Sequence, residues 1–495
     1  MSRYADWKAP KQDYASLVWP DPPRLITDMA VNRAALDAAP VEIQNVPLRQ
    51  WREVTRRSLI GDPAAAVIAT GHQIELSHPG VWVKDVLLDA VARKTGATAL
   101  HVAVDTDSPK HLQLRWPGGA IDLSDDVLLK TGEWSGQVAQ PTPPHLQRIR
   151  ERFDQAAAGW SFRPAIAIAF ESLSRLNNSS DMLPAALSRA AHAVDESLGV
   201  HYQVRLLSSI VTEPAYLAFV HHIAADVERF ATTYNAALAD YRREAGITTP
   251  TRPMPDLRVD EDTIELPFWF DRLDTGDRSR ATVIRDNGRW HLLTDAAAFV
   301  FDPATPGEEA AERFGAFCRQ HQIRLTPRAL TLTAFLRLII ADQFVHGIGG
   351  GRYDQVTDRL IENYFRVPAP TFAVTTATLF FPDAGERDAE CVPCLLNEGH
   401  RLRHNTVTKQ PYLDRIAAAP RRSTDRRTAY VAMHNVLQKE SAISTSLMEW
   451  REKLDHAVRR RDHEAVLFDR ELFYAVQPRE RLERLIKTYR TAVGV

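Results

Sequence analysis

The sequence predicts an α/β protein with a parallel sheet at its core, an inserted region of strands and helices, and a helical C-terminal part. Three observations support this fold class. Residues 64–107 have the pattern of a strand, a polar loop, a helix and a second strand. The first strand is apolar on both faces, as a strand covered by helices on each side must be. A later apolar strand, QFVHGI, runs directly into three glycines and another helix.

Composition agrees with a large folded protein. The chain has 495 residues, of which 44% are hydrophobic, so it can bury a core spread over two or three structural units. Lysine plus arginine (61) nearly balance aspartate plus glutamate (63), so the charge predicts no nucleic-acid partner and no membrane partner. The N-terminal stretch MSRYADWKAPKQDY lacks the apolar core of a signal peptide, and three cysteines exclude a disulfide framework. We therefore expect a cytoplasmic protein.

The most apolar window of the chain is residues 329–345. It carries Arg337 and Asp342 and is too interrupted by charge to span a bilayer. We interpret it as a buried helix that leads into a strand.

The first strand-helix-strand unit has clear boundaries. Its strands are expected at residues 64–70 and 99–104. Pro79 suits the first turn of the helix between them, and Gly96 ends that helix. Apolar positions at helical spacing predict its buried face: Val83, Leu87, Ala90 and Val91.

The rest of the chain adds strands and helices of both kinds. HLQLRW and AIDL are short strand candidates, and the apolar runs at 165–170 and 202–209 predict two further strands. After Pro214 a helical stripe continues to Tyr241. The segments TIELPFWF, RATVIRD and RWHLLT alternate as strands do, with a hairpin at the DNG of residues 286–288.

These patterns divide the chain into five expected parts. Residues 1–60 form an N-terminal arm on the core, residues 61–210 the first part of the core, residues 211–320 a long helix and inserted β region, residues 321–380 the second part of the core, and residues 381–495 a charged helical region. The last part is a candidate for self-association into a homo-oligomer.

Candidate functional side chains gather where the first two strands end. Gly71, His72 and Gln73 follow the first strand, and Asp105 and Asp107 follow the second. Because parallel strands send their carboxyl ends to one edge, these residues are expected to lie together. Asp105 and Asp107 alternate along the chain and point to opposite sides, so one of them is expected to face the ligand. The helix that follows can add His78 and Lys84 as phosphate contacts, although such residues also cap helices or remain solvated.

The second candidate loop is IGGGRYD. Gly349, Gly350 and Gly351 allow a positive φ and bring backbone N–H groups close to an anion at the start of a helix. Arg352 adds positive charge, and Asp354 is placed to cap the helix. The spacing fits neither a Walker A motif nor a dinucleotide fingerprint, and a tight structural turn is an equally good interpretation.

The GHQ segment after the first strand, Lys84 within the next helix, an acidic loop after the second strand and the late IGG turn together resemble the bacillithiol-biosynthesis cysteine-adding enzymes. The resemblance covers roughly residues 64–380 and implies a nucleotidyltransferase-like Rossmann core and a reaction that joins cysteine to the amine of a glucosaminyl malate. His72, Gln73, Lys84, Gly349 and Gly350 match the motifs of the family.

The chain departs from the family pattern at two places. Its acidic loop is DTDSPKH, which makes Asp105 and Asp107 approximate equivalents only. Where the family continues with proline, glycine and glutamate, this chain has Gly351, Arg352, Tyr353 and Asp354.

The sequence therefore predicts a ligase-like enzyme that acts on a small molecule. ATP or ADP is expected between the two loops, with His72, Lys84 and the glycine amides stabilising phosphate charge. Asp105 or Asp107 is expected to position Mg²⁺ or to accept a proton, and Asp354 to orient the acceptor. The alternative is a non-catalytic relative that binds a metabolite or acts as a scaffold.

A separate motif has the spacing of a zinc site. Cys391 and Cys394 form C-x2-C, and His400 and His404 lie one helical turn apart. The connection of five residues is shorter than in usual zinc fingers, which favours an unmetallated pair of buried cysteines.

Overall fold

The structure is a computed structural model that describes residues 7–108, 111–125, 137–176, 182–249, 251, 253–382, 392–405 and 409–495. The chain forms two compact units. The first comprises residues 1–379 together with 470–495, and the second comprises residues 380–469. The C-terminal 470–495 segment therefore belongs to the first unit, whereas the sequence grouped it with the helical region.

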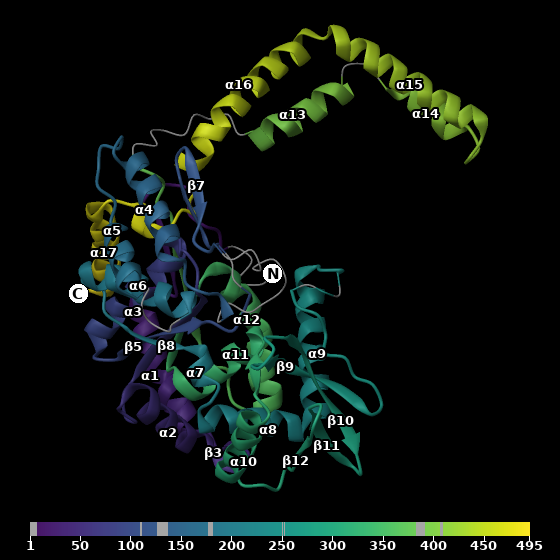
Figure 1. Cartoon of the computed structure of the whole chain (residues 1–495). Helices are drawn as coiled ribbons and strands as arrows, with labels where there is room; N and C mark the ends of the chain where they lie inside the picture. The colour runs from purple at the N-terminus through teal and green to yellow at the C-terminus, as the bar shows by residue number, and fades with distance from the viewer. Residues whose placement is uncertain are drawn as a thin grey trace. The chain divides into compact units, whose positions relative to one another are not determined.

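A mostly parallel sheet of six strands forms the centre of the first unit (Figure 1). From β4 the chain moves outward through β5 and β8, then returns to the other side of β4 for β14 and β15. The strand order therefore reverses between β4 and β14. Only the edge strand β1 is antiparallel to its neighbour. Across the sheet the strands are β1 (Ser16–Trp19), β15 (Phe372–Ala377), β14 (Gln343–His346), β4 (Val67–Gln73), β5 (Thr98–Val104) and β8 (Gln203–Leu206).

The helix that joins β4 to β5 follows the sequence signals closely. α3 (Pro79–Thr95) has proline in its first turn and ends at Gly96, which adopts the left-handed conformation. It is buried around most of its surface, including the face predicted from its apolar spacing. The C-terminal helix α17 (Arg479–Val493) packs on it, and Arg490 Nη2 donates to Asp89 Oδ2 at 2.9 Å. The end of the chain thus covers a helix from its first quarter.

The N-terminal arm is bound to the sheet by buried charge. Besides β1 it contains α1 (Pro22–Ala38), the short strands β2 (Glu42–Ile43) and β3 (Val46–Pro47), and α2 (Leu48–Ile60). Arg52 and Arg56 of α2 reach Asp342 Oδ1 at 2.5 and 2.7 Å, and Val67 N donates to its Oδ2 at 2.8 Å. The aspartate inside the apolar window is therefore paired, as a buried charge must be.

Between β5 and β8 the chain forms a short hairpin and a group of helices. The elements are β6 (Gln113–Trp116), β7 (Gly119–Asp122), α4 (Pro143–Ala157), α5 (Ala167–Leu176) and α6 (Leu183–Ser197), and the four-residue α7 (Leu207–Ile210) follows β8. The hairpin confirms the two short strand candidates. The prediction of a strand at 165–170 is wrong because that run enters α5. A short apolar run has no periodicity that separates a strand from a buried helix.

An antiparallel half-barrel is inserted between the two halves of the core. Its strand order is β12 (Ala298–Phe301), β11 (Arg289–Leu293), β10 (Arg278–Asp286), β9 (Thr263–Arg272) and β13 (Ile323–Pro327). The predicted DNG hairpin joins β10 to β11, with Asn287 and Gly288 both at positive φ. The helices of this part are α8 (Pro214–Ala225), α9 (Val227–Ala245) and α10 (Gly307–Gln320). The predicted single stripe after Pro214 is thus divided between two helices at Asp226.

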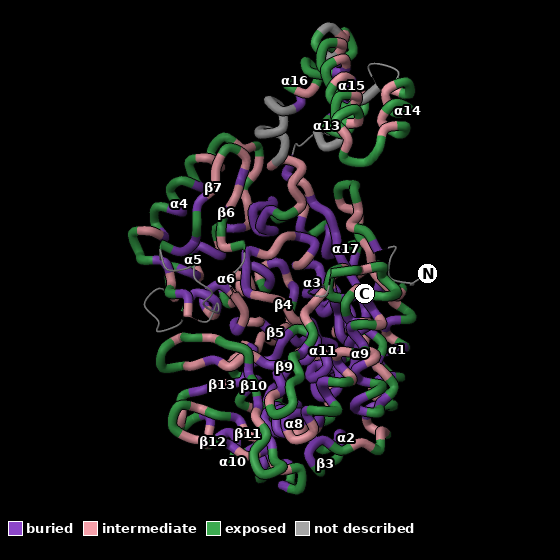
Figure 2. Tube along the Cα trace, turned by 90° about the vertical axis from the view of Figure 1, so that its right-hand side faces the viewer, coloured by how far each residue is buried: buried purple, intermediate pink, exposed green. Residues whose placement is uncertain are grey.

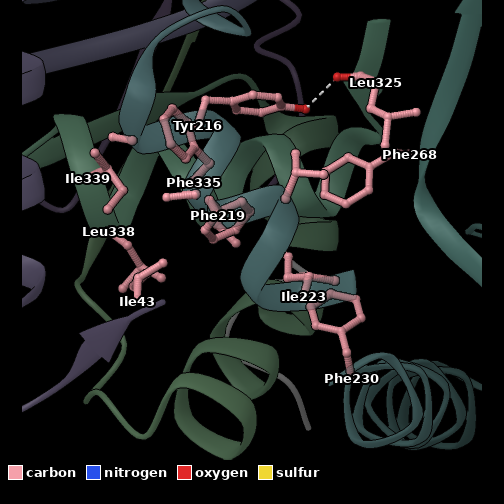
Figure 3. Packing of buried hydrophobic residues seen from close by; sticks show 14 of the residues in the cluster. Ile43, Tyr216, Phe219, Ile223, Phe230, Phe268, Leu325, Phe335, Leu338 and Ile339 are labelled. Atoms are coloured by element: carbon pink, nitrogen blue, oxygen red, sulfur yellow. Dashed lines mark hydrogen bonds between the residues drawn. The ribbon is translucent and has the colours of Figure 1, made fainter. Parts of the chain in front are cut away.

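Aromatic side chains join the insert to the core. Figure 3 shows Tyr216 and Phe219 of α8 beside Phe335, with ring centroids 5.2 and 5.4 Å from that ring. The Tyr216 hydroxyl donates to Leu325 O of β13 at 3.0 Å, so this buried polar atom is satisfied. Most residues of α8 are buried (Figure 2).

The apolar window of residues 329–345 forms the helix and strand predicted for it. It consists of α11 (Ala329–Phe335), a π-helical turn η3 (Leu336–Ile340) and β14. α12 (Ile348–Leu360) follows β14 and continues into η4 (Ile361–Phe365). In the described part of the chain, no helix is both long and apolar enough to cross a membrane.

The second unit is helical. It contains α13 (Val392–Asn405), α14 (Gln410–Ala418), α15 (Thr424–Ile443) and α16 (Thr445–Leu467). A small core of Leu395, Leu447, Trp450 and Ala457 joins α13 to α16, and Trp450 Nε1 donates to Leu395 O at 2.6 Å. Most of its described residues are exposed to solvent (Figure 2).

Candidate functional site

The two predicted loops lie at the same edge of the sheet. β4 and β14 are adjacent and parallel, and Thr70 is paired with Val345. The segment Gly71 to Gln73 at the end of β4 therefore lies beside the turn that follows β14. His72 and Gln73 are still strand residues, because β4 is displaced by three residues from the expected 64–70. This edge is also where the strand order reverses, which in open α/β sheets is the usual place of a ligand.

Lys84 lies under this edge, in the second turn of α3. The residue is buried, and its Nζ donates to Gly71 O at 3.2 Å. Burial lowers the pKa of Lys84 to about 8, against the opposing effect of Asp85 and Glu75. A lysine of this kind can lose or regain its proton near neutral pH.

His72 is kept as a neutral imidazole. Burial, and then the charge of Lys84, lower the pKa of His72 well below its usual value. Its Nδ1 lies 2.9 Å from Gln73 O and 3.6 Å from Glu75 Oε1. Because a carbonyl oxygen can only accept, Nδ1 carries the hydrogen and Nε2 is left as an acceptor.

His78 caps α3. Its Nδ1 accepts a hydrogen bond from Gly80 N at 3.0 Å, which leaves the hydrogen on Nε2. Burial and the charge of Arg470 lower the pKa of His78 to about 3. The guanidinium of Arg470 donates to Thr376 Oγ1 at 2.9 Å and lies against the first turn of α3, where a Cβ on Gly80 would stand 2.4 Å from its Nη2. We call His72, His78, Lys84 and Arg470 the basic edge.

The two acidic residues after β5 have different partners. Asp105 Oδ1 accepts from Ser208 N at 2.9 Å and fixes the start of α7. Asp107 accepts from the side-chain amide of Gln73 and from Ser108 N. Of the two, Asp107 is therefore the carboxylate that is hydrogen-bonded to the GHQ segment. No set of three or more histidine, cysteine or acidic side chains that could hold a metal ion occurs among the described residues.

The glycine turn differs from its prediction. The three glycines belong to the first turn of α12, and none of them has a positive φ. Close packing requires two of them: a Cβ on Gly350 would stand 2.8 Å from His346 Nδ1, and one on Gly351 would stand 2.5 Å from Val374 Cγ2. Gly351 N already donates to Gly347 O at 3.0 Å, whereas a Cβ on Gly349 would meet nothing within 4 Å.

Asp354 and Arg352, which follow this turn, both bond to other residues of the chain. Asp354 does not cap the helix. It is buried in α12, with its Oδ2 2.6 Å from Arg337 Nη1 and 2.9 Å from His346 Nε2. The Arg352 guanidinium donates to Trp7 O. The desolvation cost of the Arg337 charge explains the position of Asp354, because a buried cation needs a paired anion.

His346 is a site residue that the sequence reasoning missed. It ends β14 and is nearly buried, and its Nε2 is bound by Asp354. Its Nδ1 faces the start of α12 at Gly350. The available signal was a histidine at the end of a strand directly before glycine, the same arrangement that singled out His72.

On the β5 side of β4 lies a cavity of about 40 Å³. It is covered by α3, by α6 and by the short η5 helix (Tyr474–Val476), whose Tyr474 N donates to Ser77 O at 2.9 Å. Among its described lining residues there are three acids but no lysine or arginine, so we call it the acidic cavity. The lining residues are Gln73, Ile74, Glu75, Ser77, Trp82, Asp85, His101, Ala103, Leu187, Ser188, Ala191, Asp195, Tyr202, Val204 and Tyr474.

Asp195 is the centre of a hydrogen-bonded group in this cavity. Its Oδ1 accepts from Trp82 Nε1 at 2.7 Å and from the Tyr474 hydroxyl at 2.8 Å, and its Oδ2 accepts from the Tyr202 hydroxyl at 2.5 Å. Burial, with a contribution from Asp85, raises the pKa of Asp195 to about 7. The indole of Trp82 stacks on Tyr474 with centroids 4.8 Å apart.

His101 and Asp85 form a hydrogen-bonded pair in the wall of the same cavity. His101 Nδ1 lies 2.6 Å from Asp85 Oδ1, which holds the imidazole with its hydrogen on Nδ1. None of Asp85, His101 or Asp195 was singled out from the sequence. Asp85 follows Lys84 directly, so the same turn of α3 supplies one residue to each of the two regions.

The zinc prediction falls largely outside the described residues. Cys391 and the side chains of Cys394 and His404 are not described, and only the His400 side chain is. The zinc site therefore stays a prediction.

No protein-family model matches this sequence, and no curated protein matches it. The resemblance to the cysteine-adding enzymes thus depends on the motifs themselves.

Proposed function

We propose that this protein is a cytoplasmic ligase-like enzyme that joins an amine to a small molecule activated by phosphate, in the manner of the cysteine-adding enzymes. The observation that carries the proposal is the convergence of GHQ, buried Lys84 and the turn after β14 at the point of strand reversal. A Rossmann-like, nucleotidyltransferase-like core binds its ligand at such a point.

The reaction we propose is an amine displacement of phosphate. The amine nitrogen forms a bond to the carbon that carries the phosphate, the carbon–oxygen bond breaks, and phosphate leaves with the electron pair. The amine gives up one proton, for which Nε2 of neutral His72 is an acceptor. In the preceding step an oxygen of the small molecule attacks the γ-phosphorus of a nucleoside triphosphate and the nucleoside diphosphate leaves, and Mg²⁺ would neutralise part of the phosphate charge.

The basic edge supplies charge stabilisation for this step. Protonated Lys84 and the Nε2–H of His78 can donate to phosphate oxygens, and Gly349 and Gly350 belong to the first turn of α12, at the adjoining strand end. Neutral His72 presents Nε2 as an acceptor. Asp107, which is bonded to Gln73, holds that side chain in place.

The alternative function is a metabolite-binding or scaffold protein without catalysis. The observation that favours it is the engagement of Asp354 and Arg352 in contacts within the fold. Two groups that the sequence assigned to the reaction are therefore held by structural partners.

Thermal unfolding with ATP and ADP, each with and without Mg²⁺, tests the proposal. A nucleotide at about 100 times its Kd should raise the unfolding free energy by about 2.7 kcal/mol. His72→Gln should reduce the nucleotide-dependent rise in unfolding free energy. It should leave the stability of the free protein unchanged, because the His72 side chain is 28% exposed. The matched control is His291→Gln on β11. The absence of a shift with every nucleotide would exclude the ligase reaction, and a shift without amine-dependent phosphate release would favour the alternative.

A further inference from the structure

We propose that the acidic cavity binds the primary ammonium group of the acceptor substrate, and that His101, held by Asp85, takes the proton from it. The proposal rests on the proposed function for the reaction that follows, but the binding itself does not need a nucleotide. It gives the amine of the proposed reaction a place beside the phosphate-facing edge and a base that takes its proton.

The charge of the cavity selects a cation. Glu75, Asp85 and Asp195 line it, and the described lining contains no lysine or arginine. Asp195 accepts hydrogen bonds from three neutral donors, so when this carboxyl ionises its charge has no cation among those contacts. An ammonium group would supply the missing positive charge, which neutral molecules of the same size cannot do.

The size of the cavity limits the ligand. A space of about 40 Å³ has room for about three water molecules. It can take an ammonium group and one or two carbons, while a larger body stays outside. The aromatic pair Trp82 and Tyr474 forms one wall, and aromatic faces attract cations.

The position of the cavity fits the reaction. Gln73 lines the cavity, and its neighbour His72 belongs to the basic edge. An amine in the cavity is thus one strand residue away from the groups proposed to hold phosphate. Asp85 accepts from His101 Nδ1, so Nε2 is the nitrogen that can receive the ammonium proton. The free nitrogen lone pair then attacks the activated carbon.

Ethylamine hydrochloride is the probe for the test, with ethanol and sodium acetate as neutral and anionic controls of similar size. Histidine ring signals of the full chain are followed by NMR, and His101→Gln identifies the His101 signal. We expect a saturable shift of that signal with ethylamine alone. The ¹⁵N shifts should also show hydrogen on Nδ1 and none on Nε2.

Two variants separate the cavity from the rest of the fold. At pH 8, where Asp195 is ionised, Asp195→Asn should weaken ethylamine binding by about tenfold or more, because it removes a buried charge of opposite sign. Ser188→Leu places a larger side chain in the cavity without changing its charge, and it should give a similar loss. His291→Gln should bind ethylamine like the natural protein.

Several outcomes overturn this inference. Equal responses to ethylamine and ethanol would show a polar cavity without preference for a cation. Unchanged ethylamine binding in both variants would place the amine elsewhere, and hydrogen on Nε2 of His101 would remove its role as a base. Nucleotide binding without amine binding contradicts the cavity assignment alone, whereas amine binding without nucleotide binding contradicts the proposed function and leaves the cavity assignment intact.

Discussion

The basic edge and the acidic cavity use the same strand and the same helix, yet their charges are opposite. His72 and Gln73 are consecutive at the end of β4, where Gln73 lines the cavity and His72 is paired with Ala103, another residue of the cavity wall. Lys84 and Asp85 are consecutive on α3 and diverge around its axis. One strand end and one helical turn therefore serve two regions, one suited to an anion and one to a cation. Two substrates of opposite charge could thus be held side by side.

The largest expected effect is the pH dependence of the unfolding free energy that Asp195 of the acidic cavity causes. The folded protein keeps the proton of Asp195 up to about pH 7, whereas the unfolded chain loses it near its usual pKa of 3.8. Stability therefore falls as the pH rises through this window, by about 4 kcal/mol for a shift of about three units. Asp195→Asn cannot ionise and should lack this fall, which urea unfolding at several pH values measures.

The exposed Asp286→Asn is the control for this series and should retain the natural slope. At pH 8 the Asp195→Asn protein should be more stable than the natural one by roughly 2–3 kcal/mol, since one weakened hydrogen bond offsets part of the gain. An identical slope in Asp195→Asn would mean that this carboxyl ionises normally.

The basic edge should show a dependence of the opposite sign. The unfolded chain keeps the proton of Lys84 up to its usual pKa of 10.5, whereas the folded protein releases it from about pH 8. Stability should therefore rise between these pH values, by about 3 kcal/mol. Lys84→Met should remove this rise and also abolish the nucleotide shift. The difference in unfolding free energy between the two proteins, measured across that range, isolates this residue.

Gly80→Ala should disturb the basic edge and spare the cavity. The new methyl group would stand 2.4 Å from Arg470 Nη2 and 2.7 Å from Thr376 Oγ1, so these side chains must move. We expect a loss of about 1–3 kcal/mol and weaker nucleotide binding. Gly159→Ala, where the Cβ would meet its nearest atom at 3.7 Å, is the matched control. Weaker ethylamine binding in Gly80→Ala would show that the two regions are not independent.

The smallest effect is expected for Trp82→Phe. It removes the indole N–H that donates to Asp195 at 2.7 Å, so stability should fall by about 1 kcal/mol. Because the indole N–H stabilises the ionised carboxylate, its loss should also raise the pKa of Asp195. The pH range over which stability falls should then extend to higher pH. Trp290→Phe on β11 is the control, and an unchanged pH midpoint in Trp82→Phe would show that the indole does not support the charge.

Local signals predicted those elements whose boundaries depend on one or two residues. Pro79 and Gly96 bound α3 as expected, and the DNG hairpin lies where its sequence placed it. The run at 165–170 misled the prediction because only its packing decides between strand and helix. Gly350 and Gly351 signalled a special position correctly, but the reason is close packing and not a positive φ.

The candidate site was predicted only where a motif marks it. His72, Gln73, Lys84 and Asp107 come together because parallel strands share an edge. From the sequence alone, Asp354 was assigned to ligand binding. Its ion pair with Arg337 could not be foreseen, because that pair joins two segments that no local pattern connects. His101 and Asp195 are single polar residues in apolar surroundings, and such residues give no signal along the chain.

The sequence alone determined the α/β class, the strand-helix-strand unit and the polar residues at the end of β4, because each follows from local periodicity and from proline and glycine. The tertiary structure decided what surrounds them. Arg470 and Tyr474 reach the start of α3 from the far end of the chain, and Asp195 approaches from α6. Burial and charge act between neighbours in space, so the neutral imidazole of His72 and the raised pKa of the Asp195 carboxyl are properties of the folded protein and not of the residues in sequence.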